Sequence, residues 1–256
     1  MNREITSAEL LSRLNEELCH VSGPAAMVFD ADGTLWSGDV GDDLFFYATD
    51  RNLLRDEARG ALIELAAAHG LDTRSTTSEL AVSLHEAEAA GRFPERALYE
   101  MMAWCFAGLR LEELADIARN ALADADLDSR LFAPLMPVLD WAREAEVETA
   151  MITASPQPIA ELAGAECGFL AEQIIACRPL VRDGVIQTAL AARIPYGSEK
   201  AQAGRRHLGD SVWLAAFGDS GFDFDMLALA RMPVAVCPTP ELLTALSALG
   251  RAFVLE

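Results

Sequence analysis

The segment Met27-Val-Phe-Asp-Ala-Asp-Gly-Thr-Leu35 decides the fold of this chain. It begins inside an apolar run, Ala25 to Phe29, which is typical of a parallel strand buried on both faces. The run ends in Asp30, and a second carboxylate, Asp32, stands just before a Gly-Thr turn. In an open α/β sheet, ligands bind beyond the carboxyl ends of the strands. Two acids at such a place favour a site for a hard cation and for reaction at a phosphoryl group, although Asp and Gly are also ordinary turn residues.

Three further features follow this segment in order along the chain. They are Thr153 after the apolar run 147–152, Lys200, and Gly218-Asp-Ser-Gly-Phe-Asp223 after the apolar run 212–217. Together with Asp30-x-Asp32-Gly-Thr34, they resemble the four motifs of the haloacid dehalogenase (HAD) superfamily. Thr153-Ala-Ser-Pro156 and the spacing of the motifs are most similar to the phosphoserine phosphatase-like branch.

The resemblance implies Mg²⁺-dependent hydrolysis of a small-molecule phosphomonoester through an aspartyl-phosphate intermediate. Asp30 is then the nucleophile, and Asp32 protonates the leaving oxygen and later accepts a proton from the attacking water. Asp219 completes the Mg²⁺ site with the Asp30 carboxylate and the Asp32 backbone carbonyl, while Asp223 holds a metal-bound water or coordinates the ion directly. The alternative interpretation is structural: a turn cap for Asp32, and a polar turn before a helix for Asp219 and Asp223.

The same resemblance implies a phosphate-binding set. Thr153 donates to a phosphoryl oxygen together with the backbone N–H groups of Gly33 and Ala154, and Lys200 neutralises developing charge and holds the nucleophile in place. Taken alone, Thr153 is typical of a strand-end cap and Lys200 of a solvated surface lysine. Arg193 is the nearest alternative cation if Lys200 is displaced.

The stretch between the first two predicted strands is too long for a plain crossover or an unstructured loop. Leu, Ala, Met and aromatic residues recur in it at i, i+3 and i+4 spacings, which predicts helices. The predicted helices are 42–50, 58–69, 78–90, 95–107 and 111–123. We therefore expect an α/β fold with a doubly wound, mostly parallel sheet in residues 1–37 and 133–256, and an inserted all-helical cap in residues 38–132. The phosphoserine phosphatase-like branch carries a helical cap at this position. The alternative is that these helices belong to the α/β core and simply enlarge it.

Other local patterns predict elements of the core. Thr6-Ser-Ala-Glu9 is a capping box that opens a helix to about His20. Ile174–Cys177 and Val185–Thr188 bracket Arg182-Asp-Gly184, which predicts a hairpin turn between them. Short strands are expected at 234–236 and 253–255.

Charge and cysteine content restrict the partners and the compartment. The chain of 256 residues carries a formal net charge of −20, which argues against nucleic acid and against an anionic membrane surface as partners. Five scattered cysteines without a Cys-x-x-Cys pattern favour free thiols. No apolar run is long enough for a membrane span and no signal core is evident, so a cytoplasmic protein is expected. The oligomeric state is left open.

Two positions bear on the substrate. The family's acid for a substrate ammonium group corresponds to Asp39, and a gapless count from Phe93 places Glu100 where phosphoserine phosphatases carry an Arg for the substrate carboxylate. Like charges at short range repel, so the hypothesis is a phosphomonoester of a cationic or neutral alcohol rather than phosphoserine. Phe222 replaces the Asn that is usual before the last Asp. The aromatic residues of the cap are expected mostly to pack in its hydrophobic core. In the alternative interpretation, one or two of them line a cation-binding pocket.

Two other functions remain open from the sequence. Phosphotransfer or a phosphomutase reaction would use an alcohol in place of water as the acceptor. A catalytically silent binding protein could also use the same fold, although all four acidic positions of the motifs are intact.

Overall fold

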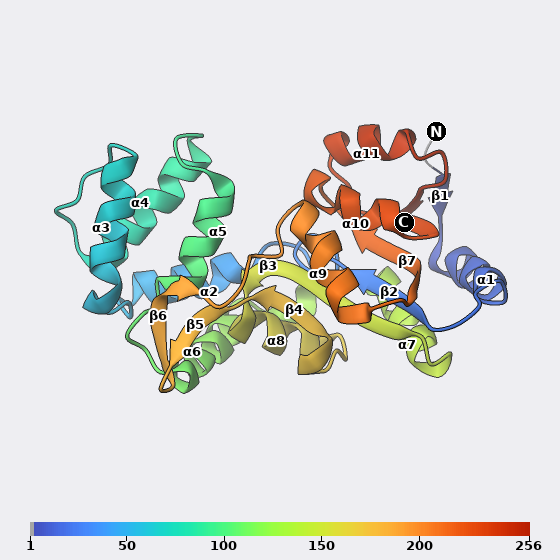
Figure 1. Cartoon of the computed structure of the whole chain (residues 1–256), viewed down its shortest axis with the longest axis horizontal. Coiled ribbons are helices and arrows are strands. Elements are labelled where there is room, and N and C mark those ends of the chain that lie inside the picture. Colours follow the sequence, from blue (N-terminus) through green and yellow to red (C-terminus); the bar gives the residue numbers. More distant parts are fainter. Residues whose placement is uncertain (1–2) are drawn as a thin grey trace.

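A seven-stranded sheet forms the centre of one lobe of the molecule, here called the sheet lobe (Figure 1). The computed structural model describes residues 3–256, so the first two residues of the predicted core segment lie outside the described part. Every neighbouring pair of strands runs parallel. In spatial order the strands are β1 (Arg3–Ile5), β9 (Phe253–Leu255), β8 (Met232–Val236), β7 (Val212–Gly218), β2 (Ala25–Phe29), β3 (Glu148–Pro156) and β4 (Ile174–Cys177).

The strand order puts a topological switch point at the end of β2. From β2 the chain moves outward through β3 and β4, and it then returns to the other side of β2 as β7. The connections after β2 and β7 therefore diverge, which leaves a crevice at the carboxyl ends of these strands.

Alternating residues of β2 belong to two separate hydrophobic cores. Met27 and Phe29 pack on one face of the sheet, and Ala26 and Val28 pack on the other. The first core also contains residues of α1 (Ser7–Leu18), α7 (Met136–Glu144) and α8 (Gln157–Glu166). The second contains residues of α9 (Ser198–Leu208), α10 (Phe224–Leu229) and α11 (Pro240–Ser247). Helices thus cover both faces of a parallel sheet, and the predicted doubly wound α/β class is confirmed.

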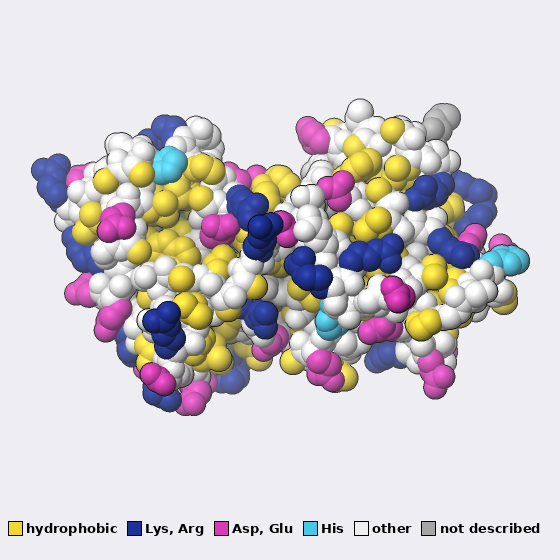
Figure 2. Space-filling model, in the orientation of Figure 1, with side chains coloured by type: hydrophobic (Ala, Val, Ile, Leu, Met, Phe, Trp, Pro, Cys, Tyr) yellow, Lys and Arg dark blue, Asp and Glu magenta, His cyan; other side chains and the backbone are white. Residues whose placement is uncertain are grey.

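The chain between β2 and β3 is helical, and most of it forms a second lobe, here called the helical lobe (Figure 1). Each observed helix begins and ends within a few residues of its predicted bounds. The helices are α2 (Val40–Asp50), α3 (Arg59–Ala68), α4 (Thr77–Ala89), α5 (Glu95–Trp104) and α6 (Leu111–Asp124). Gly70, Gly91 and Gly108 follow α3, α4 and α5 and have positive φ angles, as expected where a helix ends. Figure 2 shows a deep notch between the two lobes on one side of the molecule.

The predicted hairpin was partly wrong. The turn is where it was expected, but the strands that flank it are β5 (Pro179–Arg182) and β6 (Val185–Leu190). Ile174–Cys177 is instead β4, the edge strand of the main sheet, which pairs with β3. Only Arg178 separates β4 from β5 along the chain. The hydrophobic pattern therefore does not reveal that the chain leaves the main sheet between these two strands. The hairpin reaches the helical lobe, where the Ile186 amide donates to the Leu109 carbonyl oxygen.

Besides β5, the sequence analysis missed β1 and α11. β1 has three residues and depends on pairing with β9, which lies at the other end of the chain. α11 is capped by the Thr239 side chain and carries Pro240 in its first turn. Both are short, and a short element gives a weak periodic signal. Within residues 3–256, no helix is both long and apolar enough to cross a membrane.

Candidate active site

Two neighbouring strands bring Asp30 and Asp219 to the same edge of the sheet. β2 and β7 are in register with Phe29 beside Phe217, and the Asp30 amide donates to the Phe217 carbonyl oxygen at 2.9 Å. Asp30 directly follows β2, and Asp219 directly follows β7. Because the carboxyl ends of adjacent parallel strands meet, both carboxylates lie at the switch point.

Helix α9 delivers Lys200 to the same place. Its side chain is buried, and Nζ donates to Asp30 Oδ1 at 2.5 Å and to Asp223 Oδ1 at 2.6 Å. Burial by itself lowers the pKa of a lysine, but Asp223 and Asp30 raise the pKa of Lys200 above its ordinary value. The ammonium therefore stays charged and fixes the nucleophile candidate. Arg193, the alternative cation, pairs with Glu199 through a largely exposed side chain.

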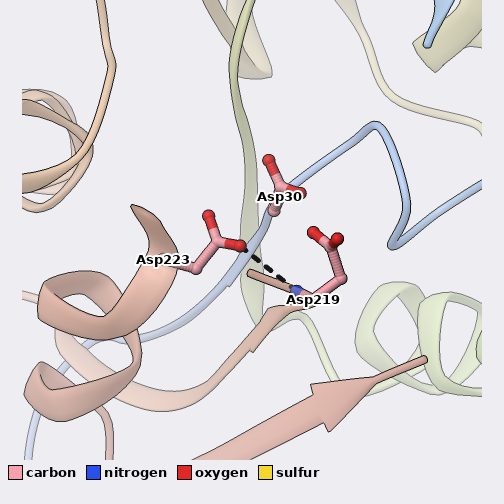
Figure 3. Close-up of side chains that lie close together, drawn as sticks. All are labelled: Asp30, Asp219 and Asp223. Atoms are coloured by element: carbon pink, nitrogen blue, oxygen red, sulfur yellow. Dashed lines mark hydrogen bonds between the residues drawn. The ribbon is translucent and has the colours of Figure 1, made fainter. Parts of the chain in front are cut away.

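Three carboxylates form a compact cluster in which Asp30, Asp219 and Asp223 point toward one another (Figure 3). Each offers an oxygen, and these oxygens lie within 4.8 Å of one another. Asp223 is fully buried, and its Oδ2 accepts from the amides of Asp219 at 3.2 Å and Ser220 at 3.1 Å. Gly33 packs against the cluster, because a Cβ atom at this residue would lie 2.6 Å from Asp219 Oδ2. A larger residue at position 33 would displace Asp219.

The cluster fits a hard divalent cation. Burial, with a further contribution from Asp223, raises the pKa of Asp219 to about 6. Crowded carboxylates of this kind repel one another, and a bound divalent cation relieves that repulsion. Mg²⁺ takes oxygen ligands and needs only one or two carboxylates besides water. The donor set and its charge therefore suit Mg²⁺.

Asp32 is held by four donors. Oδ1 accepts from the Trp36 indole and from the Val40 amide, each at 2.8 Å. Oδ2 accepts from Thr153 Oγ1 at 3.2 Å and from Ser155 Oγ at 2.6 Å. Thr153 and Ser155 lie two positions apart in β3, so their side chains reach the same face of the strand. Sequence reasoning missed Ser155, and the Thr-x-Ser spacing on a strand was the available signal.

A cavity of about 350 Å³ opens over these residues. Seven residues of the predicted catalytic and phosphate-binding set line it: Asp30, Asp32, Gly33, Thr153, Ala154, Lys200 and Asp219. Asp223 lies behind this surface and contacts the cavity residues through Lys200 and the Asp219 amide. The structure therefore brings together the residues that the four motifs supply.

The structure brings one of the two predicted substrate residues to the cavity. Asp39 lines it and caps α2 by accepting from the Asp42 amide at 3.1 Å. Burial, followed by the charges of Asp32 and Asp42, raises the pKa of Asp39 well above its ordinary value.

Glu100 requires a correction. Among the described residues, those of α5 that line the cavity are Glu95 and Tyr99, whereas Glu100 pairs with Arg96 at 3.0 Å. Glu95 and Tyr99 are four positions apart and share one helix face, while Glu100 is turned about 100° from Tyr99. The count from Phe93 along the sequence therefore identified the helix that lines the cavity, but it selected a residue on a face of that helix that does not line it.

Three aromatic residues complete the wall of the cavity. Tyr99 lines it from the helical lobe, Tyr196 from the segment before α9, and Phe222 from the turn after β7. Tyr196 and Phe222 were missed as wall residues, because their positions depend on how separate segments pack together. Trp36 is buried beside Asp32 and belongs to the core.

Comparison with known proteins agrees with this geometry. The family model described as haloacid dehalogenase-like hydrolase matches residues 27–228, and the chain belongs to this family. No curated protein sequence matches the chain.

Solved structures share the fold at low sequence identity. A protein of unknown function from Bordetella pertussis Tohama I has a TM-score of 0.71 at 19% identity, with 92% of this chain and 99% of that chain covered. A functionally unknown protein from Anaerococcus prevotii has a TM-score of 0.68 at 14% identity, with 100% and 97% covered. A substrate-bound phosphoserine phosphatase has a TM-score of 0.51 at 14% identity, with 92% and 93% covered. The fold is thus shared with phosphoserine phosphatases, as the motifs implied.

Proposed function

We propose that this HAD hydrolase is a Mg²⁺-dependent phosphatase that hydrolyses a small-molecule phosphomonoester through an aspartyl-phosphate on Asp30. One observation carries the proposal: Lys200 bridges Asp30 and Asp223 beside Asp219, at the floor of an open cavity. This arrangement combines a fixed carboxylate nucleophile with a buried cation where phosphoryl charge develops.

The residues of the cavity floor divide the chemistry between them. Asp30 attacks phosphorus, and the bond from phosphorus to the alcohol oxygen breaks. Asp32 gives its proton to that oxygen and then takes a proton from the water that cleaves the aspartyl-phosphate. Asp30 and Asp219, with the Asp32 carbonyl and with Asp223 behind them, would hold Mg²⁺, which supplies positive charge between the anionic nucleophile and the anionic substrate when bound.

The hydroxyl groups around Asp32 suggest how phosphate binding prepares this acid. Thr153 and Ser155 both donate to Asp32 Oδ2. A phosphoryl group in the cavity offers these hydroxyls alternative anionic acceptors. When both Thr153 and Ser155 turn away from Asp32 Oδ2, and Thr153 joins the amides of Gly33 and Ala154 at the phosphoryl group, Asp32 Oδ2 is free to carry the proton.

The helical segment 38–132 acts as an inserted cap in this proposal, on a core of residues 1–37 and 133–256. α5 supplies Glu95 and Tyr99 to the cavity from one side, and the strand ends supply the reacting groups from the other. The cap therefore contacts the alcohol part of the substrate, whereas the core contacts the phosphate.

Asp30→Asn tests the assignment of the nucleophile. The amide neither attacks phosphorus nor binds a cation well, so phosphate release from a panel of phosphomonoesters with Mg²⁺ should be lost, as it should for wild type after chelation. Asp116→Asn, on the exposed surface of α6, is the matched control and should keep full turnover. Turnover of Asp30→Asn above about one hundredth of wild type would overturn the assignment, since the uncatalysed reaction is negligible.

Product analysis in the same panel separates the alternatives. Free phosphate in proportion to the released alcohol supports hydrolysis, and transfer to an added alcohol would indicate a phosphotransferase. A folded wild-type protein that binds phosphomonoesters without turning any of them over would be a silent binding protein.

A further inference from the structure

The cavity has little positive charge beyond the point of reaction. Among the described residues that line it, Lys200 is the only Lys or Arg, and its ammonium is already bonded to Asp30 and Asp223. A substrate therefore finds one cation on the cavity floor, where its phosphate must lie. An additional anionic group on the alcohol would find no cation of its own on the lining.

The wall that faces the alcohol is acidic. Glu95 reaches the cavity from the first turn of α5, and Asp39 reaches it from the start of α2. Glu95 has no ion-pair partner among the described residues, unlike Glu100 on the same helix, which pairs with Arg96. Glu95 is thus a carboxylate at the cavity wall whose charge is not neutralised by the protein.

Aromatic rings stand beside this carboxylate. Tyr99 lies one helical turn after Glu95, and its ring centre is 5.9 Å from that of Tyr196. The Tyr196 ring centre is 4.6 Å from that of Phe222, a residue that is 39% exposed. Three separate segments therefore place rings in a row along one wall. Such a row next to a carboxylate without an ion-pair partner is the environment that ammonium and quaternary ammonium groups prefer.

Resting on the proposed phosphatase activity, we infer that the substrate is the phosphate ester of a cationic amino alcohol, whose ammonium group lies between Glu95 and the rings of Tyr99, Tyr196 and Phe222. The phosphate binds at Lys200, and the cation lies at the opposite, acidic wall. A neutral alcohol of the same shape loses the charge attraction. An alcohol with a carboxylate is repelled by Glu95.

A comparison of isosteric substrates tests the inference on the wild-type enzyme with Mg²⁺. Phosphocholine and phosphoethanolamine carry the cation, 3,3-dimethylbutyl phosphate is the uncharged isostere of phosphocholine, and phosphoserine adds a carboxylate. We expect kcat/KM for the better cationic ester to exceed that for the neutral isostere by about 10-fold or more. A desolvated cation–π contact and one nearby opposite charge each strengthen binding by about 10-fold. Phosphoserine should be a poorer substrate than phosphoethanolamine.

Glu95→Gln and Glu100→Gln form a matched pair on α5. Glu95→Gln should raise KM for the cationic ester by about 10-fold and leave KM for the neutral isostere unchanged, with little effect on kcat for either. Glu100→Gln should change neither constant. Tyr99→Leu should raise KM for the cationic ester more than KM for the neutral isostere.

An aryl phosphate separates failure of this inference from failure of the proposed function. Turnover of p-nitrophenyl phosphate without any preference for the cationic esters, or equal effects of Glu95→Gln and Glu100→Gln, would overturn the inference and leave the phosphatase proposal standing. Absence of turnover with every ester, the aryl phosphate included, would overturn both.

Discussion

Lys200 determines the charge balance of the site. It is the cation that bridges Asp30 and Asp223, while Asp219 lies beside them. A buried carboxylate is tolerated only when it is paired or hydrogen-bonded, because desolvation disfavours its charge. The contact between Lys200 and Asp30, the proposed nucleophile, therefore also keeps this part of the fold stable.

Lys200→Met should lower both activity and stability. Loss of the cation leaves buried carboxylates without compensation, so we expect about 10²-fold or greater loss in kcat and about 3–5 kcal/mol loss in the free energy of unfolding near pH 8. Urea denaturation measures the second effect. Uncompensated buried acids have raised pKa values in the folded state, so their destabilising effect is present at high pH and is relieved as the pH falls through those values. The stability deficit should therefore shrink near pH 5.

Arg119→Met is the control for Lys200→Met. Arg119 pairs with Asp116 on the surface of α6, where the two side chains are 63% and 72% exposed, and such pairs contribute about 0–1 kcal/mol. A stability deficit for Lys200→Met that matches this control, or that grows as the pH falls, would contradict the assigned role of Lys200.

Residues at strand ends could be predicted from the sequence, and residues of the opposite wall could not. Asp30 and Asp219 directly follow buried apolar runs, and the rule for parallel sheets brings such positions together. Glu95 and Tyr196 reach the cavity only because a helix of one lobe and a loop of the other pack side by side. No local pattern encodes that packing, and a count along the chain therefore selected Glu100 in place of Glu95.

At the scale of elements, α2 and α4 are joined by a contact that depends on pH. His85 Nε2 of α4 lies 2.9 Å from Asp42 Oδ1 of α2, and the His85 ring stacks on Phe45 at 5.4 Å. The hydrogen bond to Asp42 raises the pKa of His85, in opposition to burial. Protonated His85 therefore stabilises the helical lobe through the Asp42 carboxylate.

His85→Gln should destabilise the protein more at acidic than at alkaline pH. A raised pKa means that the stabilisation is fully present below the ordinary histidine pKa of about 6.5 and is lost as the pH rises through the higher folded-state value. The difference in unfolding free energy between wild type and His85→Gln should thus be larger near pH 5.5 than near pH 9. A difference that is independent of pH would mean that His85 acts by packing alone.

The elements themselves were predicted to different extents. The helices of the insertion were predictable because each carries its own apolar periodicity and its own end signals. The hairpin β5–β6 was not predictable in this way. Its strands have the same kind of sequence pattern as the edge strand β4, and they differ from it in the strand with which they pair. Pairing between strands is a long-range property, and the same sequence pattern serves a strand of either sheet.

At the scale of the whole molecule, the acidic charge opposes folding. The formal net charge is −20, and acidic side chains are spread over both lobes on the face shown in Figure 2. Several ion pairs are exposed, such as Arg119 with Asp116 and Arg143 with Asp140, and pairs of this kind contribute little. Repulsion among the excess acids should therefore outweigh attraction within these pairs.

Added salt should accordingly stabilise the protein at neutral and alkaline pH. Raising NaCl from about 20 mM to about 200 mM shortens the Debye length to below about 10 Å, which screens the excess charge. We expect an increase in Tm of about 2–4 °C near pH 8, equivalent to about 1 kcal/mol. The same titration near pH 5, close to the pI of about 4.5, is the control, because the net charge there is small and the increase should vanish. A fall in Tm with salt near pH 8 would show that attraction within the ion pairs outweighs the net repulsion, so the balance of charge proposed here would be wrong.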